Sequence, residues 1–161
     1  MTADEIKALL KLAPHPKEGG FFRRTYTSAG TVELPRGLRA QGTAIYYLLE
    51  AGTFSEMHVL DSDEIFHFYL GDPIRMMQLD PDGNGRTIML GPDVLHGQQL
   101  QVVVPRGVWQ GSCLEPCGTF ALLGCTVAPG FEYADYESGD RQSLQAQYPA
   151  FAEAIRRLTP G

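Results

Sequence analysis

Basic residues are scarce in this 161-residue sequence, and a long apolar run is missing altogether. Thirteen lysines and arginines stand against nineteen aspartates and glutamates, which gives a formal net charge of −6. Because contact with a phosphate backbone needs a basic surface, this balance argues against nucleic acid as a partner. A membrane helix needs about 20 apolar residues in a row, so no membrane span is expected. The first residues also lack the basic and apolar regions of a secretory signal.

Cysteine is also scarce, and its count of three is odd. We expect reduced thiols in a cytoplasmic protein, because disulfide frameworks use paired cysteines in secreted chains. Cys113 and Cys117 flank a turn-like Glu115-Pro116 stretch. A zinc site there would need further soft ligands nearby, and the sequence offers none. The cysteine pattern therefore predicts no structural metal site.

Short segments rich in β-branched and aromatic residues fill most of the chain, separated by turns of Gly, Pro, Asp and Asn. This pattern predicts about eight or nine strands in a sandwich or barrel. The expected strands cover residues 21–27, 43–50, 53–60, 65–70, 74–79, 86–90, 100–104, 108–113 and 120–127. No shift of composition divides the chain, so one domain is expected over residues 1–161.

A helix is expected at each end of the chain. Thr2 and Glu5 form a capping box at the start of an amphipathic segment over residues 1–12. Pro149 is expected to open the second helix, because proline favours the first helical position. Residues 31–41 are expected to form a loop, which is long enough to lie over a pocket mouth or a partner.

The stretch from Gly52 to Gly71 holds two of the four histidines. An Asp-Ser-Asp turn separates its two strands, so a hairpin is expected. Side chains alternate faces along a strand, and His58 and Glu64 can then meet across this hairpin. His67 falls on the opposite face from Glu64. The pair is consistent with two metal ligands, with an acid–base pair, or with a buried structural histidine beside a surface carboxylate.

The spacing of this stretch resembles the first cupin motif, with Leu60 where that motif has its second histidine. A Pro-Arg-Gly turn at residues 105–107 resembles the second cupin motif, with Gln110 in place of its histidine. The residues in register are Gly52, His58, Glu64, Gly71, Pro105 and Gly107. Together with residues 19–23 and 125–131, they make the chain similar to the small cupin-5 family, whose function is unassigned.

This resemblance implies an all-β protein, a double-stranded β-helix or jelly-roll cupin barrel over roughly residues 20–136, with short N- and C-terminal helices. A metal-dependent cupin uses three histidines and a glutamate, which suit a transition metal. Here the ligands would be His58, Glu64 and Gln110, and a glutamine binds such ions weakly. The resemblance therefore allows a transition metal as cofactor without predicting one.

Without a metal, the pocket resembles that of sugar-nucleotide epimerases among the cupins, which use acid–base chemistry. The resemblance then implies an isomerase or epimerase of a sugar or nucleotide-sugar. His58 would be the base, because imidazole ordinarily titrates near neutral pH, and Glu64 would orient it. Gln110 would bind the substrate, and the apolar walls would come from Phe66 and Phe68. The alternatives are a non-catalytic cupin that only binds a small molecule, and a weak metal-dependent enzyme.

Several other polar residues are candidates for the same pocket. Arg23 and Arg24 alternate along the strand over residues 21–27, and at least one is expected to line the site and bind an anionic group. Tyr46 and Tyr47 must point opposite ways, and either of them, or His67, could supply a second acid–base group. The polar cluster at residues 135–137 either closes over the pocket or forms a capped turn.

Apolar side chains occur on both faces of some strands, as in the pairs Tyr46-Tyr47 and Ile65-Phe66. An outer face of this kind is usually covered. We therefore expect a homodimer, because pairing of two subunits would cover it.

Overall fold

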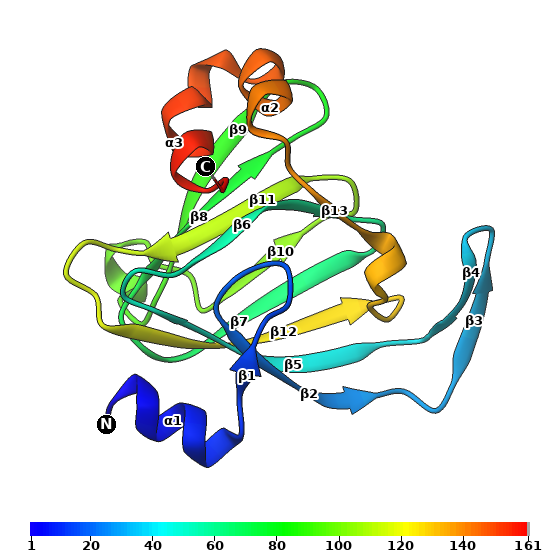
Figure 1. Cartoon of the computed structure of the whole chain (residues 1–161), viewed down its shortest axis with the longest axis horizontal. Coiled ribbons are helices and arrows are strands. Elements are labelled where there is room, and N and C mark those ends of the chain that lie inside the picture. Colours follow the sequence, from blue (N-terminus) through cyan, green and yellow to red (C-terminus); the bar gives the residue numbers. More distant parts are fainter. Residues whose placement is uncertain (161) are drawn as a thin grey trace.

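The computed structural model describes residues 1–160, and most of its strands belong to two facing antiparallel sheets (Figure 1). The larger sheet has the order β1-β2-β5-β12-β7-β10, made of β1 (Ala13–Pro14), β2 (Phe21–Thr27), β5 (Thr43–Glu50), β12 (Phe120–Ala128), β7 (Asp63–Gly71) and β10 (Gln101–Val104). The smaller has the order β13-β6-β11-β8-β9, made of β13 (Tyr136–Ser138), β6 (Phe54–Leu60), β11 (Trp109–Leu114), β8 (Ile74–Leu79) and β9 (Gly85–Leu90). The expected jelly-roll barrel is confirmed.

The main core lies between the two sheets, because alternate residues of each strand point inward. Tyr47, Phe66 and Leu123 are completely or almost completely buried there, together with inward residues of β8, β9 and β10. Their outward neighbours along the strands, such as Tyr46 and Ile65, are only half-buried. The alternation of apolar residues in the sequence therefore corresponds to a barrel with a filled interior.

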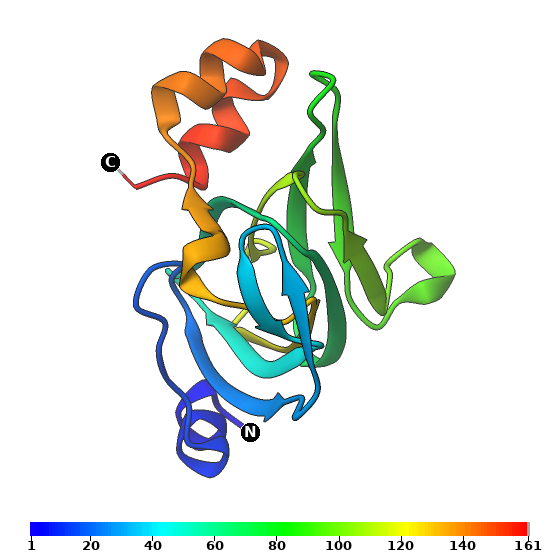
Figure 2. The ribbon, with the colours of Figure 1, turned by 90° about the vertical axis from the view of Figure 1, so that its right-hand side faces the viewer.

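Helices cover parts of both outer faces. Helix α1 (Ala3–Leu10) packs Ile6 against Leu48 and Leu122 of the larger sheet. Its predicted capping box is confirmed, because the Glu5 backbone N–H donates to Thr2 Oγ1 at 3.2 Å and the Thr2 N–H donates to Glu5 Oε2 at 2.7 Å. The C-terminal helices α2 (Arg141–Gln147) and α3 (Ala152–Arg157) cover the smaller sheet (Figures 1 and 2). No helix between residues 1 and 160 has the length and apolar character that crossing a bilayer requires.

One sequence-based prediction of secondary structure is wrong and another is incomplete. Residues 31–41 are not a loop, since β3 (Thr31–Leu34) and β4 (Gly37–Ala40) pair around the Pro35-Arg36 turn. Figure 2 shows this hairpin in front of the barrel end that faces the viewer. The C-terminal helical region begins earlier than expected, at Arg141 with Asp140 as its cap. The helix expected after Pro149 is present, since Pro149 opens the 3-10 turn η3 (Pro149–Phe151), which runs directly into α3. Two further 3-10 turns are η1 (Val94–His96) and η2 (Tyr133–Asp135).

The predicted hairpin around Asp61-Ser62-Asp63 is also wrong. The turn is present, but β6 pairs with β11 and β13, whereas β7 pairs with β12 and β10. The chain therefore crosses from one sheet to the other at this turn. His58 and Glu64 consequently face each other across the barrel interior, from opposite sheets.

Candidate functional site

A small cavity of about 30 Å³ lies between the two sheets, near the end of the barrel beside η2. Six of its lining residues carry polar or charged side chains, namely His15, Glu18, Arg24, Thr43, His58 and Glu64. The other six are Phe22, Ile45, Leu60, Cys125, Val127 and Phe131. We call this space the interior cavity. It brings His58 and Glu64 together with His15, Glu18 and Thr43, none of which the sequence singled out.

His58 is fixed with one ring nitrogen available to a ligand. Its Nδ1 lies 2.7 Å from the carbonyl oxygen of Glu56 on the same strand. A carbonyl can only accept a hydrogen bond, so Nδ1 donates to it, and in the neutral ring Nε2 carries the lone pair. The ring stacks on Tyr136, with centroids 4.9 Å apart and planes inclined by 17°. This arrangement orients His58 as a hydrogen-bond acceptor or base at the cavity wall.

Glu64 is buried and bonded to Gln110, whose Nε2 donates to Glu64 Oε2 at 2.6 Å. Burial raises the pKa of the Glu64 carboxyl to about 8; the charge of Glu18 also raises it, and the bond from Gln110 opposes the rise. At neutral pH the side chain is therefore mainly a neutral carboxylic acid. It can donate a proton or a hydrogen bond into the interior cavity, which a carboxylate cannot do.

His15 and Glu18 belong to the segment at residues 15–20, which we call the strap. His15 Nδ1 accepts the backbone N–H of Glu18 at 2.9 Å, so the neutral ring carries its proton on Nε2, which lies 3.8 Å from Glu18 Oε2. Burial lowers the pKa of His15, against the opposing charge of Glu18, which favours this neutral form. In the neutral rings, Nε2 of His15 is therefore a hydrogen-bond donor, whereas Nε2 of His58 is an acceptor.

Glycine allows the strap to lie this close to the barrel wall. Gly20 has a φ of +67°, and a Cβ there would come within 2.7 Å of the Leu48 carbonyl oxygen. The Tyr47 hydroxyl donates to the Gly19 carbonyl at 2.9 Å, and Glu18 Oε1 accepts the Ser55 hydroxyl at 2.6 Å. The sequence carries one signal for this segment, the Gly19-Gly20 pair four residues after His15.

The cluster at residues 135–137 closes over the site. The Tyr136 ring covers His58, and its hydroxyl donates to Glu56 Oε1 at 2.8 Å. Buried Asp135 accepts two bonds of 2.7 Å from Arg39 on the β3–β4 hairpin, while Glu137 is exposed. The hairpin that was predicted to be a loop therefore anchors the segment that holds Tyr136 in place.

The remaining predicted site residues divide between the two faces of the larger sheet. Arg24 lines the interior cavity and donates from Nη2 to the Phe131 carbonyl at 3.1 Å. Arg23 lies on the outer face, with its guanidinium 5.8 Å from the centre of the Tyr46 ring. The structure therefore does not bring Arg23 or Tyr46 to the cavity, because the residues facing the interior are the alternate ones.

The two phenylalanines proposed as ligand walls, Phe66 and Phe68, do point into the barrel. They are packed within the main core and are absent from the cavity lining. His67 faces outward as expected, with Nε2 3.1 Å from Thr126 Oγ1. Of the three proposed second acid–base groups, Tyr46 and His67 lie outside, and the Tyr47 hydroxyl is bonded to the strap. His15 occupies that role geometrically.

The metal site of metal-dependent cupins does not fit these residues. Leu60 presents hydrocarbon to the interior cavity, and the Gln110 amide donates to Glu64 instead of standing beside it as a ligand. Over residues 1–160, no group of three or more His, Cys, Asp or Glu side chains is arranged to hold a metal ion.

Comparison with known proteins places these observations in a family. The family model Cupin_5, described as Cupin superfamily (DUF985), matches residues 4–139. The uncharacterized protein YML079W of Saccharomyces cerevisiae is 30% identical over 134 residues, which cover 74% of this chain and 67% of that protein.

Two solved structures resemble the whole fold. A hypothetical protein from Leishmania major is 31% identical, with a TM-score of 0.93 and complete coverage of both chains. Protein SO0799 from Shewanella oneidensis is 34% identical, with a TM-score of 0.90 over 99% of this chain and 98% of that one. These names describe no activity, so the chemistry has to be argued from the site.

Proposed function

Since the chain belongs to the Cupin_5 family of the cupin superfamily, we propose that its interior cavity binds a small molecule and isomerises or epimerises it by metal-independent acid–base chemistry. The observation that carries this proposal is the pairing of a free His58 Nε2 with a neutral Glu64 on opposite walls of one cavity. A lone pair and an acidic proton facing one space are what proton transfer at carbon requires.

In the proposed reaction, His58 Nε2 removes a proton from a carbon next to a carbonyl group. The electron pair of that C–H bond moves into a carbon–carbon double bond, and the carbonyl oxygen takes the Glu64 proton, which gives a neutral enediol. Return of a proton to the same or the neighbouring carbon, with Glu64 recovering its own, completes the isomerisation. His15 Nε2–H can bind a second substrate oxygen, because its tautomer makes it a donor.

The substrate class follows from the lining. Arg24 uses one of its five N–H donors on the Phe131 carbonyl, so others remain for a phosphate or carboxylate. Apolar residues such as Ile45 and Val127 suit the C–H face of a sugar ring. We therefore propose a sugar phosphate or a nucleotide-linked sugar as substrate.

Size favours the alternative of a non-catalytic binding protein. Pockets for drug-sized ligands usually measure about 300–1,000 Å³, whereas the interior cavity measures about 30 Å³. A sugar can enter only if the strap or the Tyr136 segment moves. A binding protein that closes around a very small ligand would need no such movement.

Deuterium exchange tests the two functions directly. The protein is incubated in D2O with a panel of aldose phosphates, ketose phosphates and nucleotide-linked keto-sugars, and proton NMR follows the C–H signals next to the carbonyl. We expect exchange with at least one class, and we expect the rate to fall as the pH rises through about 8, since Glu64 then loses the required proton. Saturable binding without exchange at any C–H would support the binding protein instead.

Elemental mass spectrometry of the same sample measures its metal content. A stoichiometric transition metal would contradict the proposed metal-independent chemistry.

The expected homodimer is a further proposal, supported by the outer face of the larger sheet. Tyr69 and Val103 are 51% and 50% exposed there, next to the half-buried Tyr46 and Ile65. Light scattering should give about twice the chain mass of 17.7 kDa, and Val103→Lys should halve it. A monomeric mass for the unmodified protein would contradict the proposal.

A cytoplasmic location and a single domain over residues 1–161 stay predictions.

A further inference from the structure

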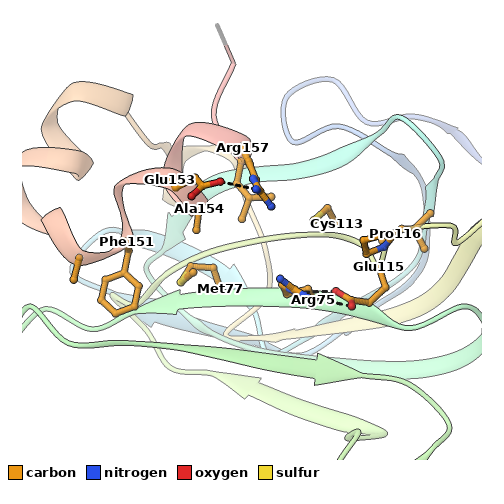
Figure 3. Close-up of a pocket in the computed structure, with 12 residues that line it drawn as sticks. Arg75, Met77, Cys113, Glu115, Pro116, Phe151, Glu153, Ala154 and Arg157 are labelled. Carbon is orange, nitrogen blue, oxygen red and sulfur yellow. Dashed lines mark hydrogen bonds and ion pairs between the residues drawn. The ribbon is translucent and has the colours of Figure 1, made fainter.

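A second and larger pocket lies outside the barrel, where the C-terminal helices pack on the smaller sheet. It measures about 360 Å³. Strands β8 and β11 form one side, and η3 and α3 form the other (Figure 3). We call it the outer pocket. Its volume lies within the usual range for small-molecule sites, unlike that of the interior cavity.

The outer pocket has an apolar end and a charged end. Figure 3 shows Phe151, Met77 and Ala154 together at the apolar end. At the charged end, Arg75 comes from the sheet side and Arg157 from the helix side, with Cys113 nearby. Burial raises the pKa of the Cys113 thiol; the charge of Arg75 opposes that rise, the charge of Glu115 adds to it, and the charge of Arg157 opposes it. Glu115 and Glu153 line the same end of the pocket, so the two guanidinium groups share it with two carboxylates.

Both arginines keep hydrogen-bond donors for a ligand. Arg75 bonds Glu115 through Nε at 2.7 Å and Nη2 at 3.1 Å, and Arg157 bonds Glu153 through Nη2. Each guanidinium has five N–H donors, so these pairs leave several on each side chain. The Arg157–Glu153 pair is about two-thirds exposed on one helix, and pairs of this kind contribute little, so a ligand can compete with it.

We propose that the outer pocket binds an amphipathic organic monoanion, with an aromatic or branched aliphatic body against Phe151 and Met77 and a carboxylate between Arg75 and Arg157. Two arginines on opposite walls hold one carboxylate through charge-assisted hydrogen bonds, and the adjoining apolar wall selects the body. This site is separate from the interior cavity, because the two share no lining residue.

Phenylacetate is a suitable probe, with two matched controls: phenylacetamide keeps the body without the charge, and acetate keeps the charge without the body. Titration of the ¹⁵N-labelled protein should shift the amide signals of Met77, Cys113 and Ala154 with phenylacetate. Each control should bind at least about tenfold more weakly. Arg157→Gln replaces an exposed side chain and leaves the core intact, so it should weaken the binding of phenylacetate by a similar factor. Arg106→Gln, at an exposed position outside the outer pocket, should leave phenylacetate binding unchanged.

Three results would overturn the proposal. One is equal binding of phenylacetamide and phenylacetate, since the arginines would then contribute nothing. Another is a change in the amide signals of Thr43 and Val127 on addition of phenylacetate, which would place the probe in the interior cavity. The third is a change of oligomeric mass in Arg157→Gln without any binding of phenylacetate, which would identify the pocket as a contact between copies of the chain.

Discussion

Replacing His58 with glutamine should lower deuterium exchange into the substrate by about 10²- to 10⁴-fold, the usual contribution of a general base. Glutamine can still donate a hydrogen bond to the Glu56 carbonyl, so the side chain can keep its place. It has no basic nitrogen, so proton abstraction loses its acceptor. The measurement is the exchange rate by proton NMR with whichever substrate class the unmodified protein accepts.

His96→Ala is the matched control. His96 lies on the exposed turn η1, where its Nδ1 is 2.8 Å from an Asp93 carboxylate oxygen. It is not among the residues that line the interior cavity. This variant should exchange at the unmodified rate, and circular dichroism should show both variants folded. If the two variants exchange equally fast, His58 is not the base and the site is wrong.

Replacing Glu64 with glutamine should change how stability depends on pH. Below the ordinary glutamate pKa of 4.5, Glu64 is protonated in the folded and the unfolded chain alike. As the pH rises from there to about 8, the unfolded chain releases this proton and the folded chain keeps it, so the Glu64 contribution to folding stability is progressively lost. Glutamine mimics the neutral acid at every pH. Glu64→Gln should therefore gain stability relative to the unmodified protein, by up to roughly 3–5 kcal/mol at pH 9.

Urea unfolding at pH 5, 7 and 9 measures this difference. Glu137→Gln, which removes an exposed carboxylate on β13, serves as the control and should track the unmodified protein. Parallel stability curves for Glu64→Gln and the unmodified protein would show that Glu64 is ionised in the fold. In that case the acid role would have to pass to another group.

The two segments that cover the interior cavity, the strap and the η2–β13 segment, also contact each other. Lys17 of the strap lies 5.6 Å from the ring centres of both Tyr133 and Tyr136, at cation–π distance. The strap and the η2–β13 segment thus contact each other directly above His58. Any ligand larger than the cavity must separate them, which makes these contacts part of the energetic cost of binding.

Local patterns were enough to predict the fold and to single out His58 and Glu64, which both line the interior cavity. Alternation of apolar residues identifies the strands, and the spacing of Gly52, His58, Glu64 and Gly71 identifies the cupin motif. Both signals operate within one strand or across one turn, so they survive without knowledge of tertiary contacts. The sequence missed the β3–β4 hairpin and α2, short elements whose stability comes from packing and caps more than from propensity. It also paired β6 with β7, although each of them pairs with strands distant in the sequence.

The sequence by itself determined the jelly-roll class, the inward faces of His58 and Glu64, and the presence of Leu60 and Gln110 where the cupin motifs have histidines. Only the tertiary structure decided what surrounds His58, because His15 and Tyr136 come from segments far away in the chain. It also decided that Arg24, and not Arg23, reaches the cavity. The protonation of Glu64 depends on burial between two sheets and on the charge of Glu18. Burial and long-range electrostatics arise only when distant segments meet, so no local pattern of residues can specify them.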